Sequence, residues 1–272
     1  MPGENLTRAE AAARAALVEV ESYDIALDLT RGDRVFASRT TIVFTADEGA
    51  STFVDLIADA VHEIVLNGRH VDPRAWDGAR IALHGLSEHN ELHVLADARY
   101  MTTGEGLHRF VDPVDQEVYL YSQFEVADSR RVFAVFEQPD LKASFRFTVT
   151  APRHWTVVSN SPTPEPEPTP DFHDAAVWRF APTPRIPSYI TAIIAGPYHR
   201  VTGELTSSDG RTIPLGVFCR TSLADHLDAE NILDVTRRGF AFFEEAFDRP
   251  YPFEKYDQLF VPEFNAGAME NA

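Results

Sequence analysis

The stretch FNAGAMENA, at residues 264–272, combines residue types that are typical of a binding site. Gly267 and Ala268 carry almost no side chain, so another extended backbone can approach them and pair with a strand edge. A thioether, a carboxylate and an amide follow at Met269, Glu270 and Asn271. The thioether would form a soft wall that suits side chains of varied shape. We therefore expect an active-site strand at this position.

A second candidate stretch is YLYSQFEVADSRRVFAVFEQPDLKASF, at residues 119–145. Gln123 and Glu125 are two residues apart in strand-like sequence, so both side chains are expected on one face of a strand. An ion-paired turn is expected next, at Asp128, Arg130 and Arg131. Buried core positions are expected at Phe133, Val135 and Phe136.

The ten histidines raise the question of a zinc site. A zinc-protease helix needs two histidines at i and i+4, with a glutamate after the first. The stretch that begins at His62 has Leu66 where the second histidine should be. His89 and His93 are correctly spaced, but Glu91 is misplaced, and in a strand residues i and i+4 lie about 13 Å apart. We predict no metal ligand within this chain, and we find no phosphate-binding loop, dinucleotide fingerprint or nucleophile elbow.

Composition limits the partners and the compartment. The chain has 24 basic and 42 acidic residues, a formal net charge of −18, which disfavours nucleic acid and anionic membrane surfaces. It has no run of about 20 apolar residues and no signal-type apolar segment near residue 1. The single cysteine, Cys219, excludes an intrachain disulfide and is expected to be a buried residue on a strand. We predict a cytoplasmic protein.

The elements that would position these residues are mostly short strands. A short helix is expected at residues 5–16, and runs rich in β-branched and aromatic residues follow it. The first expected strands are at residues 22–30, 35–46, 51–57, 62–68, 80–86 and 90–100. Two more are expected within 141–160, and the proline-rich run at 161–170 is expected to be an exposed loop before strands resume at 175–196. This pattern favours a sandwich or layered sheets.

The pattern changes near residue 200. Two strands are expected at 198–205 and 213–220, followed by one long helix at 222–247 that Pro250 and Pro252 end. A strand at 256–264 then leads into the FNAGAMENA stretch at 264–272, called the closing stretch below. We place domains at residues 1–200 and 201–272. Apolar surface is expected to remain exposed on Phe242, Phe243 and Phe247.

The Gly-Ala-Met-Glu-Asn run and the segment SQFEVADSRRVFAVFEQPDLKASF (122–145) together resemble the M1 family of zinc aminopeptidases, and its bacterial aminopeptidase N branch most closely. Residues 103–125 also resemble that branch. The resemblance implies a mainly β fold: an N-terminal sandwich or saddle-like domain of layered antiparallel and mixed sheets, then the start of an α+β thermolysin-like catalytic domain. Many members have Phe-Asp-Glu-Pro where this chain has Phe136-Glu137-Gln138-Pro139.

The resemblance also implies an activity, the removal of N-terminal amino acids from peptides. It assigns Glu125 and Glu270, assisted by Gln123, to the substrate's α-amine, a cation with a pKa near 8. It assigns the closing stretch to the substrate backbone, in a cleft between the two domains. The family's zinc-binding helix and catalytic tyrosine would lie beyond residue 272. We therefore expect a portion of a longer enzyme that alone holds no catalytic residue, binds no zinc and is inactive.

Two alternatives remain open at this point. Leukotriene hydrolase-like M1 enzymes share the implied architecture, but their motif begins Gly-Gly where this chain has Gly267-Ala268. A non-catalytic β-sandwich interaction scaffold would also fit a chain without a metal site. A His-Glu-x-x-His helix in the following codons would support the peptidase, and its absence would support the scaffold.

Overall fold

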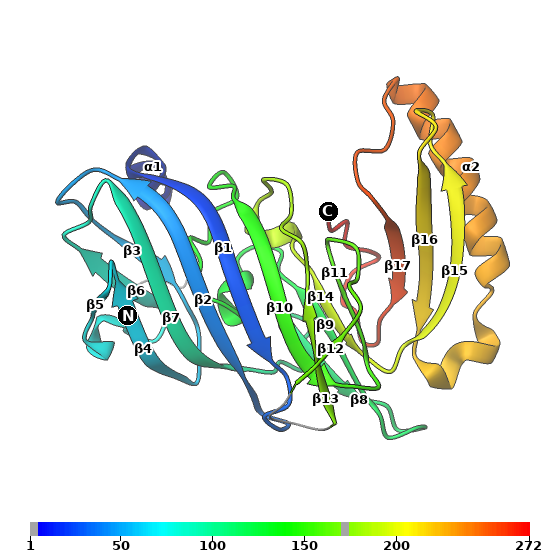
Figure 1. Cartoon of the computed structure of the whole chain (residues 1–272), viewed down its shortest axis with the longest axis horizontal. Coiled ribbons are helices and arrows are strands. Elements are labelled where there is room, and N and C mark those ends of the chain that lie inside the picture. Colours follow the sequence, from blue (N-terminus) through cyan, green and yellow to red (C-terminus); the bar gives the residue numbers. More distant parts are fainter. Residues whose placement is uncertain (1–4, 170–173) are drawn as a thin grey trace.

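Strands dominate the computed structural model, which describes residues 5–169 and 174–272 (Figure 1). The largest sheet is mixed, because β1 and β10 run parallel while the other neighbours run antiparallel. Its strands in spatial order are β12 (Glu167–Pro168), β13 (Ala175–Arg179), β10 (Ser144–Pro152), β1 (Val18–Asp28), β2 (Val35–Ala46), β7 (His89–Arg99), β4 (Ala60–Leu66) and β5 (Arg69–His70). The expected mainly β fold is confirmed.

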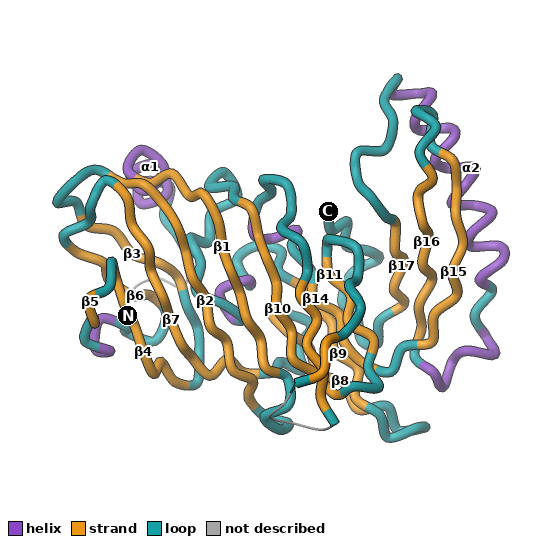
Figure 2. The backbone as a smooth tube through the Cα atoms, in the orientation of Figure 1, coloured by secondary structure: helices purple, strands orange, loops and turns teal. Residues whose placement is uncertain are grey.

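Three smaller sheets hold the remaining strands, as Figure 2 shows. A four-stranded sheet consists of β11 (Thr156–Ser159), β14 (Ile193–Gly196), β9 (Val118–Gln123) and β8 (Gly106–Val111). A three-stranded sheet consists of β15 (His199–Thr206), β16 (Thr212–Cys219) and β17 (Tyr256–Phe260). The last pair is β3 (Ser51–Asp55) with β6 (Arg80–His84). The three-stranded sheet stands apart from the largest sheet, and the C-terminus lies between them (Figure 1).

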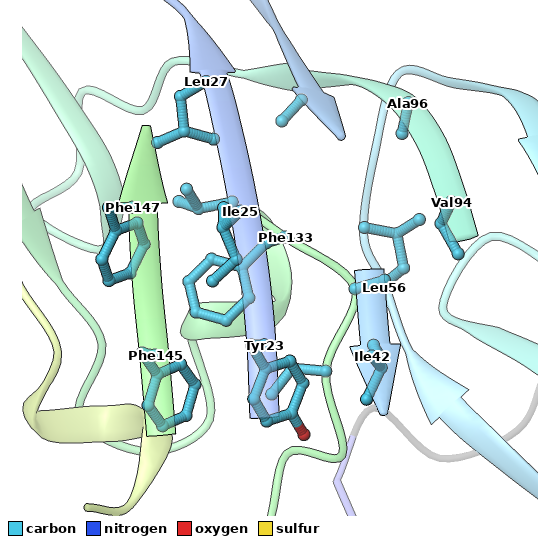
Figure 3. Close-up of a cluster of buried hydrophobic side chains, with 14 of the residues drawn as sticks. Tyr23, Ile25, Leu27, Ile42, Leu56, Val94, Ala96, Phe133, Phe145 and Phe147 are labelled. Atoms are coloured by element: carbon cyan, nitrogen blue, oxygen red, sulfur yellow. The ribbon is translucent and has the colours of Figure 1, made fainter. Parts of the chain in front are cut away.

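The core against the largest sheet combines aliphatic and aromatic side chains (Figure 3). Alternation along β1 turns Tyr23, Ile25 and Leu27 inward, and all three are buried. The ring of Tyr23 stacks on Phe145 of β10, with centroids 4.7 Å apart and planes 3° apart. The Tyr23 hydroxyl accepts a hydrogen bond from the Phe136 N–H at 3.1 Å, so this buried polar atom is satisfied. The expected burial of the aromatic run is confirmed at Phe133, Val135 and Phe136.

Two α-helices flank the sheets. The first, α1 (Arg8–Leu17), begins at a capping box in which Thr7 and Glu10 bond each other's backbone, close to the expected 5–16. The second, α2 (Ala229–Phe247), covers the outer face of the three-stranded sheet (Figure 1). Short 3₁₀ turns are η1 (Pro73–Ala75), η2 (Ser129–Arg131), η3 (Ser188–Ile190) and η4 (Thr221–His226). None of the described helices is both long and apolar enough to cross a membrane.

The expected single helix at 222–247 is wrong at its start. Residues 221–226 form the 3₁₀ turn η4, and Leu227 leaves the helical range with ψ 106° before α2 begins at Ala229. The cause is tertiary, since the Ser222 hydroxyl donates to the buried Asp112 carboxylate and Leu227 packs under the three-stranded sheet. The end of the helix is as expected: Asp248 takes the left-handed conformation before Pro250.

Two further expectations need correction. The strand expected at 256–264 stops at Phe260, where its parallel pairing with Cys219 ends. The proline-rich run is mostly irregular, but Glu167 and Pro168 pair with β13, and Pro170 lies outside the described residues. Cys219 is buried at the end of β16 as expected, and burial raises the pKa of its thiol.

Candidate functional site

A cavity of about 760 Å³ lies between the four-stranded sheet and β17. On the first side it is lined by residues of β9, β11 and β14, among them Tyr121, Ser159 and Ile194. On the other side it is lined by β17 and the residues just before it. All of Gly267–Asn271 lines it as well. The cavity is thus formed by segments on both sides of residue 200, which is where we expected a substrate cleft.

The closing stretch is a loop, so the expected active-site strand is wrong. Over residues 261–272, the one main-chain to main-chain hydrogen bond that the structure describes is from the Ala272 N–H to the Ile190 carbonyl, at 3.2 Å. Asn160 Nδ2 also donates to the Ala272 carbonyl at 2.6 Å. A strand needs a ladder of such bonds with a neighbour, and here only the last residue has one. Before it, the Glu263 carbonyl accepts a hydrogen bond from the Tyr121 hydroxyl at 3.2 Å.

Gln123 and Glu125 do not share a strand face as expected. The strand β9 ends at Gln123, and Glu125 lies in the following turn, where its N–H donates to Gln123 Oε1 at 2.9 Å. The amide side chain of Gln123 therefore caps this turn. Neither residue is among those that line the cavity, although the preceding Ser122 does. Their partnership with Glu270 in amine binding stays a prediction.

The expected ion-paired turn forms in part. Arg131 Nε donates to Asp128 Oδ1 at 2.6 Å. The Arg130 side chain instead donates to Asn5 Oδ1 at 3.0 Å, while its backbone N–H donates to Glu137 Oε2 at 2.8 Å. The turn is therefore held from two sides, by an ion pair and by a buried carboxylate.

The Phe136-Glu137-Gln138-Pro139 run is structural in this fold. Glu137 is buried and accepts hydrogen bonds from the hydroxyls of Ser129 and Ser188, and burial raises the pKa of its carboxyl. Gln138 accepts from Arg14 Nε at 3.1 Å and donates to the Ala11 carbonyl at 2.9 Å. These contacts tie α1 to the core, a role that the sequence pattern did not indicate.

Two of the three candidate histidines, His62 and His93, have local partners. His62 Nε2 lies 2.8 Å from Asp97 Oδ2. On β7, His93 contacts Thr41 of the neighbouring β2 through Nδ1 and Glu91 of its own strand through Nε2. No group of three or more His, Cys, Asp or Glu side chains suited to a metal ion occurs among residues 5–169 and 174–272. The described residues therefore do not fit a catalytic zinc ion.

One ion pair at the cavity was missed by sequence reasoning. Lys255 Nζ lies 2.6 Å from Asp257 Oδ2, and both side chains are about nine-tenths buried. Burial lowers the pKa of Lys255, although the Asp257 carboxylate opposes this. The two charges compensate each other. Lys255 is therefore not the partner of Glu270, the acidic residue that also lines the cavity. Sequence reasoning missed the pair because no recognised motif surrounds Lys255 and Asp257, which are only two residues apart.

Family models match most of the chain. The model of the peptidase M1 N-terminal domain matches residues 19–190, and that of the peptidase family M1 domain matches residues 232–272. The chain belongs to the M1 peptidase family. The two matches leave residues 191–231 between them, so the boundary of this M1 peptidase near residue 200 stays a prediction.

Known relatives of this M1 peptidase chain are aminopeptidases. Aminopeptidase N of Streptomyces lividans is 59% identical over 277 residues, which cover 100% of this chain and 31% of that protein. Aminopeptidase N of Homo sapiens is 27% identical, over 92% of this chain and 28% of that protein. The chain thus spans about a third of the length of these relatives. They do not favour the leukotriene hydrolase-like or the scaffold alternative.

A solved structure shows the same fold for this part of an M1 peptidase. The crystal structure of Legionella pneumophila aminopeptidase A in complex with aspartic acid superposes with a TM-score of 0.82. The match covers 94% of this chain and 30% of that one, at 17% sequence identity. At that identity the likeness establishes the arrangement of the sheets.

Proposed function

We propose that this chain is the substrate-recognition part of a zinc aminopeptidase that removes N-terminal amino acids from peptides. The observation that carries the proposal is the position of Gly267–Asn271, which line one wall of the cavity between the four-stranded sheet and β17. The aminopeptidase relatives and the M1 family membership support it. We assign the chemical step, and the zinc ion that the family uses for it, to residues outside these 272.

The recognition step follows from charge. A peptide's free α-amine is a cation near neutral pH, and a carboxylate in a partly enclosed site binds it by a charge-assisted hydrogen bond. Glu270 supplies such a carboxylate in the cavity wall. We assign Glu125, in the turn after β9, as the second acidic contact, assisted by Gln123 at the end of that strand. A mid-chain peptide segment lacks the cation and would leave these charges unpaired, at a cost of several kcal/mol.

The backbone of the substrate would lie along Gly267 and Ala268. These residues have little side chain and make no main-chain hydrogen bond to another described residue, so their backbone groups are free to bond a peptide. Met269 would contact the first side chain and adapt to several shapes. The site is therefore suited to broad specificity.

We also propose a cytoplasmic protein whose partners are peptides with a free N-terminus, not nucleic acid or membrane. The net charge of −18 supports this choice, because phosphate-rich surfaces would repel the chain. The lone, buried Cys219 is compatible with a reducing compartment.

The test compares the 272-residue chain with the intact gene product. We expect the intact protein to bind zinc and to hydrolyse an amino-acid anilide, and the 272-residue chain to do neither. Metal analysis and a leucyl-anilide assay measure both properties. Turnover by the shorter chain, or an intact protein with neither zinc nor activity, would refute the proposal.

A further inference from the structure

His108 connects the loop before β8 to the segment that leads into the cavity wall. The Gly104 N–H donates to His108 Nδ1 at 3.1 Å, and His108 Nε2 lies 3.2 Å from Glu263 Oε2. A backbone N–H can only donate, so Nδ1 carries the lone pair and the ring proton is on Nε2. The Nε2–H then donates to the Glu263 carboxylate. One neutral tautomer satisfies both contacts.

The surroundings of the ring favour this neutral form. The His108 side chain is 1% exposed and stacks on Tyr121, with ring centroids 4.8 Å apart. Burial lowers the pKa of His108, although the Glu263 carboxylate opposes this. A proton on Nδ1 would also set its N–H against that of Gly104. Among the described residues, Glu263 and Tyr121 are the titratable groups in contact with the ring.

Two further contacts hold the same segment. The Tyr121 hydroxyl donates to the Glu263 carbonyl at 3.2 Å, and Asn265 Nδ2 donates to the Thr103 carbonyl at 2.7 Å. A Cβ on Gly104, which has φ +85°, would collide with the Asn265 side chain. Glu263 itself has φ +53°, a conformation that a residue with a Cβ keeps only when its surroundings hold it.

The cavity-lining loop is therefore fixed at two ends. Its far end is held where Ala272 bonds to Ile190 and Asn160, and its near end is held through Glu263 and Asn265. Between them, no main-chain hydrogen bond to another described residue holds Gly267–Asn271. The position of this loop must depend on its two ends.

We propose that His108 and Glu263 are positioning residues that hold Gly267–Asn271 at the wall of the cavity. Their effect on substrate binding rests on the proposed function, but their effect on the loop does not. The contacts join β8 to a residue 155 positions further along the chain. The β8 histidine thus acts on the geometry of the site through Glu263, with no contact to the reacting atoms.

A matched pair of substitutions tests the proposal. In His108→Gln the amide can reach the place of Nε2 and still donate to Glu263, while in His108→Asn it reaches only the place of Nδ1. Both variants lose the ring stacking on Tyr121. The Gln amide keeps the Glu263 contact and gives up the Gly104 contact, and the Asn amide does the reverse, so their difference compares the two contacts. We expect backbone ¹⁵N order parameters of residues 266–271 to fall below about 0.6 in His108→Asn, and to stay near wild-type values in His108→Gln.

A second pair acts at an exposed residue, where folding is not at risk. Glu263→Gln keeps an acceptor for the His108 Nε2–H, and Glu263→Ala removes it. We expect exchange of the Ala272 amide to be roughly fivefold faster in Glu263→Ala than in Glu263→Gln, with equal unfolding midpoints. Equal loop order in the two His108 variants, or equal exchange in the two Glu263 variants, would overturn the proposal.

The tautomer gives an independent spectroscopic readout. Imidazole ¹⁵N spectra of the wild-type chain should show His108 protonated at Nε2 and unprotonated at Nδ1, and the reverse would overturn the proposal. These measurements use no substrate. If they succeed while the intact enzyme fails to cleave peptides, the proposed function is wrong and the positioning contact stands.

Discussion

Asp112 and Arg220 form an ion pair that joins the four-stranded sheet to the turn after β16. Arg220 Nη1 lies 2.6 Å from Asp112 Oδ2, and the Asp112 side chain is fully buried. The Ser222 hydroxyl donates to the same oxygen at 2.5 Å, and the Arg220 guanidinium lies 5.0 Å from the ring of Phe110. The two sides of the cavity are therefore held together by a charge contact as well as by apolar packing.

Removing the Asp112 charge should loosen this junction. We expect Asp112→Asn to lower the free energy of unfolding by about 1–3 kcal/mol, since charge-assisted hydrogen bonds are replaced by neutral ones. Cys219 is adjacent to Arg220 and buried, so its labelling by a thiol reagent should become faster in the variant. Asp47→Asn, an exposed site with the same change of charge, is the control. Equal labelling rates in all three proteins would contradict the assigned role.

The same carboxylate predicts a pH dependence. Burial alone would raise the pKa of Asp112, but hydrogen bonds from Ser222 and the Val114 N–H and the Arg220 charge outweigh it and hold the pKa below that of an ordinary aspartate. On acidification the Asp112 carboxylate therefore takes up its proton at a higher pH in the unfolded chain than in the folded one. The contribution of Asp112 to folding stability is complete above the pKa that an aspartate has in the unfolded chain. It is lost as the pH falls through the lower folded-state pKa. Urea unfolding from about pH 5 to about pH 3 should show a shallower loss of stability in Asp112→Asn. Parallel curves would exclude Asp112 as the cause.

Sequence patterns predicted the large sheet well because its strands alternate between a buried and an exposed face. Tyr23, Ile25 and Leu27 show this period directly. The same reasoning failed where tertiary contacts decide the backbone. The helical pattern at 222–228 is overridden by the Ser222 contact with Asp112.

The candidate site was predictable in its composition and less so in its geometry. Gly267–Asn271 line the cavity, but as a loop, because they find no strand partner. The contacts that shape the cavity are between distant residues, such as His108 with Glu263, and no local pattern marks them. Gln123 and Glu125 were assigned to a strand face because the strand end at Gln123 has no proline or glycine signal.

Loss of the Glu270 carboxylate should affect substrate binding most. In the intact enzyme we expect Glu270→Gln to cost about 2–5 kcal/mol in kcat/KM, roughly 30-fold or more, with a raised KM for a leucyl anilide. Glu254→Gln makes the same chemical change at an exposed residue that does not line the cavity. A Glu270→Gln enzyme with the KM of the control would argue against amine recognition by this residue.

The two faces of α2 should respond differently to substitution. Leu233 is buried against Gly203 of β15, so Leu233→Ala should cost about 2–5 kcal/mol in the free energy of unfolding. Phe242, Phe243 and Phe247 are 64%, 55% and 73% exposed, as the sequence led us to expect. Phe243→Ser should therefore change the free energy of unfolding by less than about 0.5 kcal/mol and reduce self-association in analytical ultracentrifugation. A large loss of stability in Phe243→Ser would show that this face is packed.

Recognition of a free N-terminus at the cavity is tested most directly by titrating two dipeptides into the ¹⁵N-labelled chain. Leucyl-leucine should shift the amide resonances of Gly267–Asn271 saturably, and N-acetyl-leucyl-leucine, which lacks the cation, should shift them far less. In Glu270→Gln the difference between the two peptides should shrink. Equal shifts from both peptides in the wild-type chain, or shifts confined to residues away from the cavity, would contradict the account.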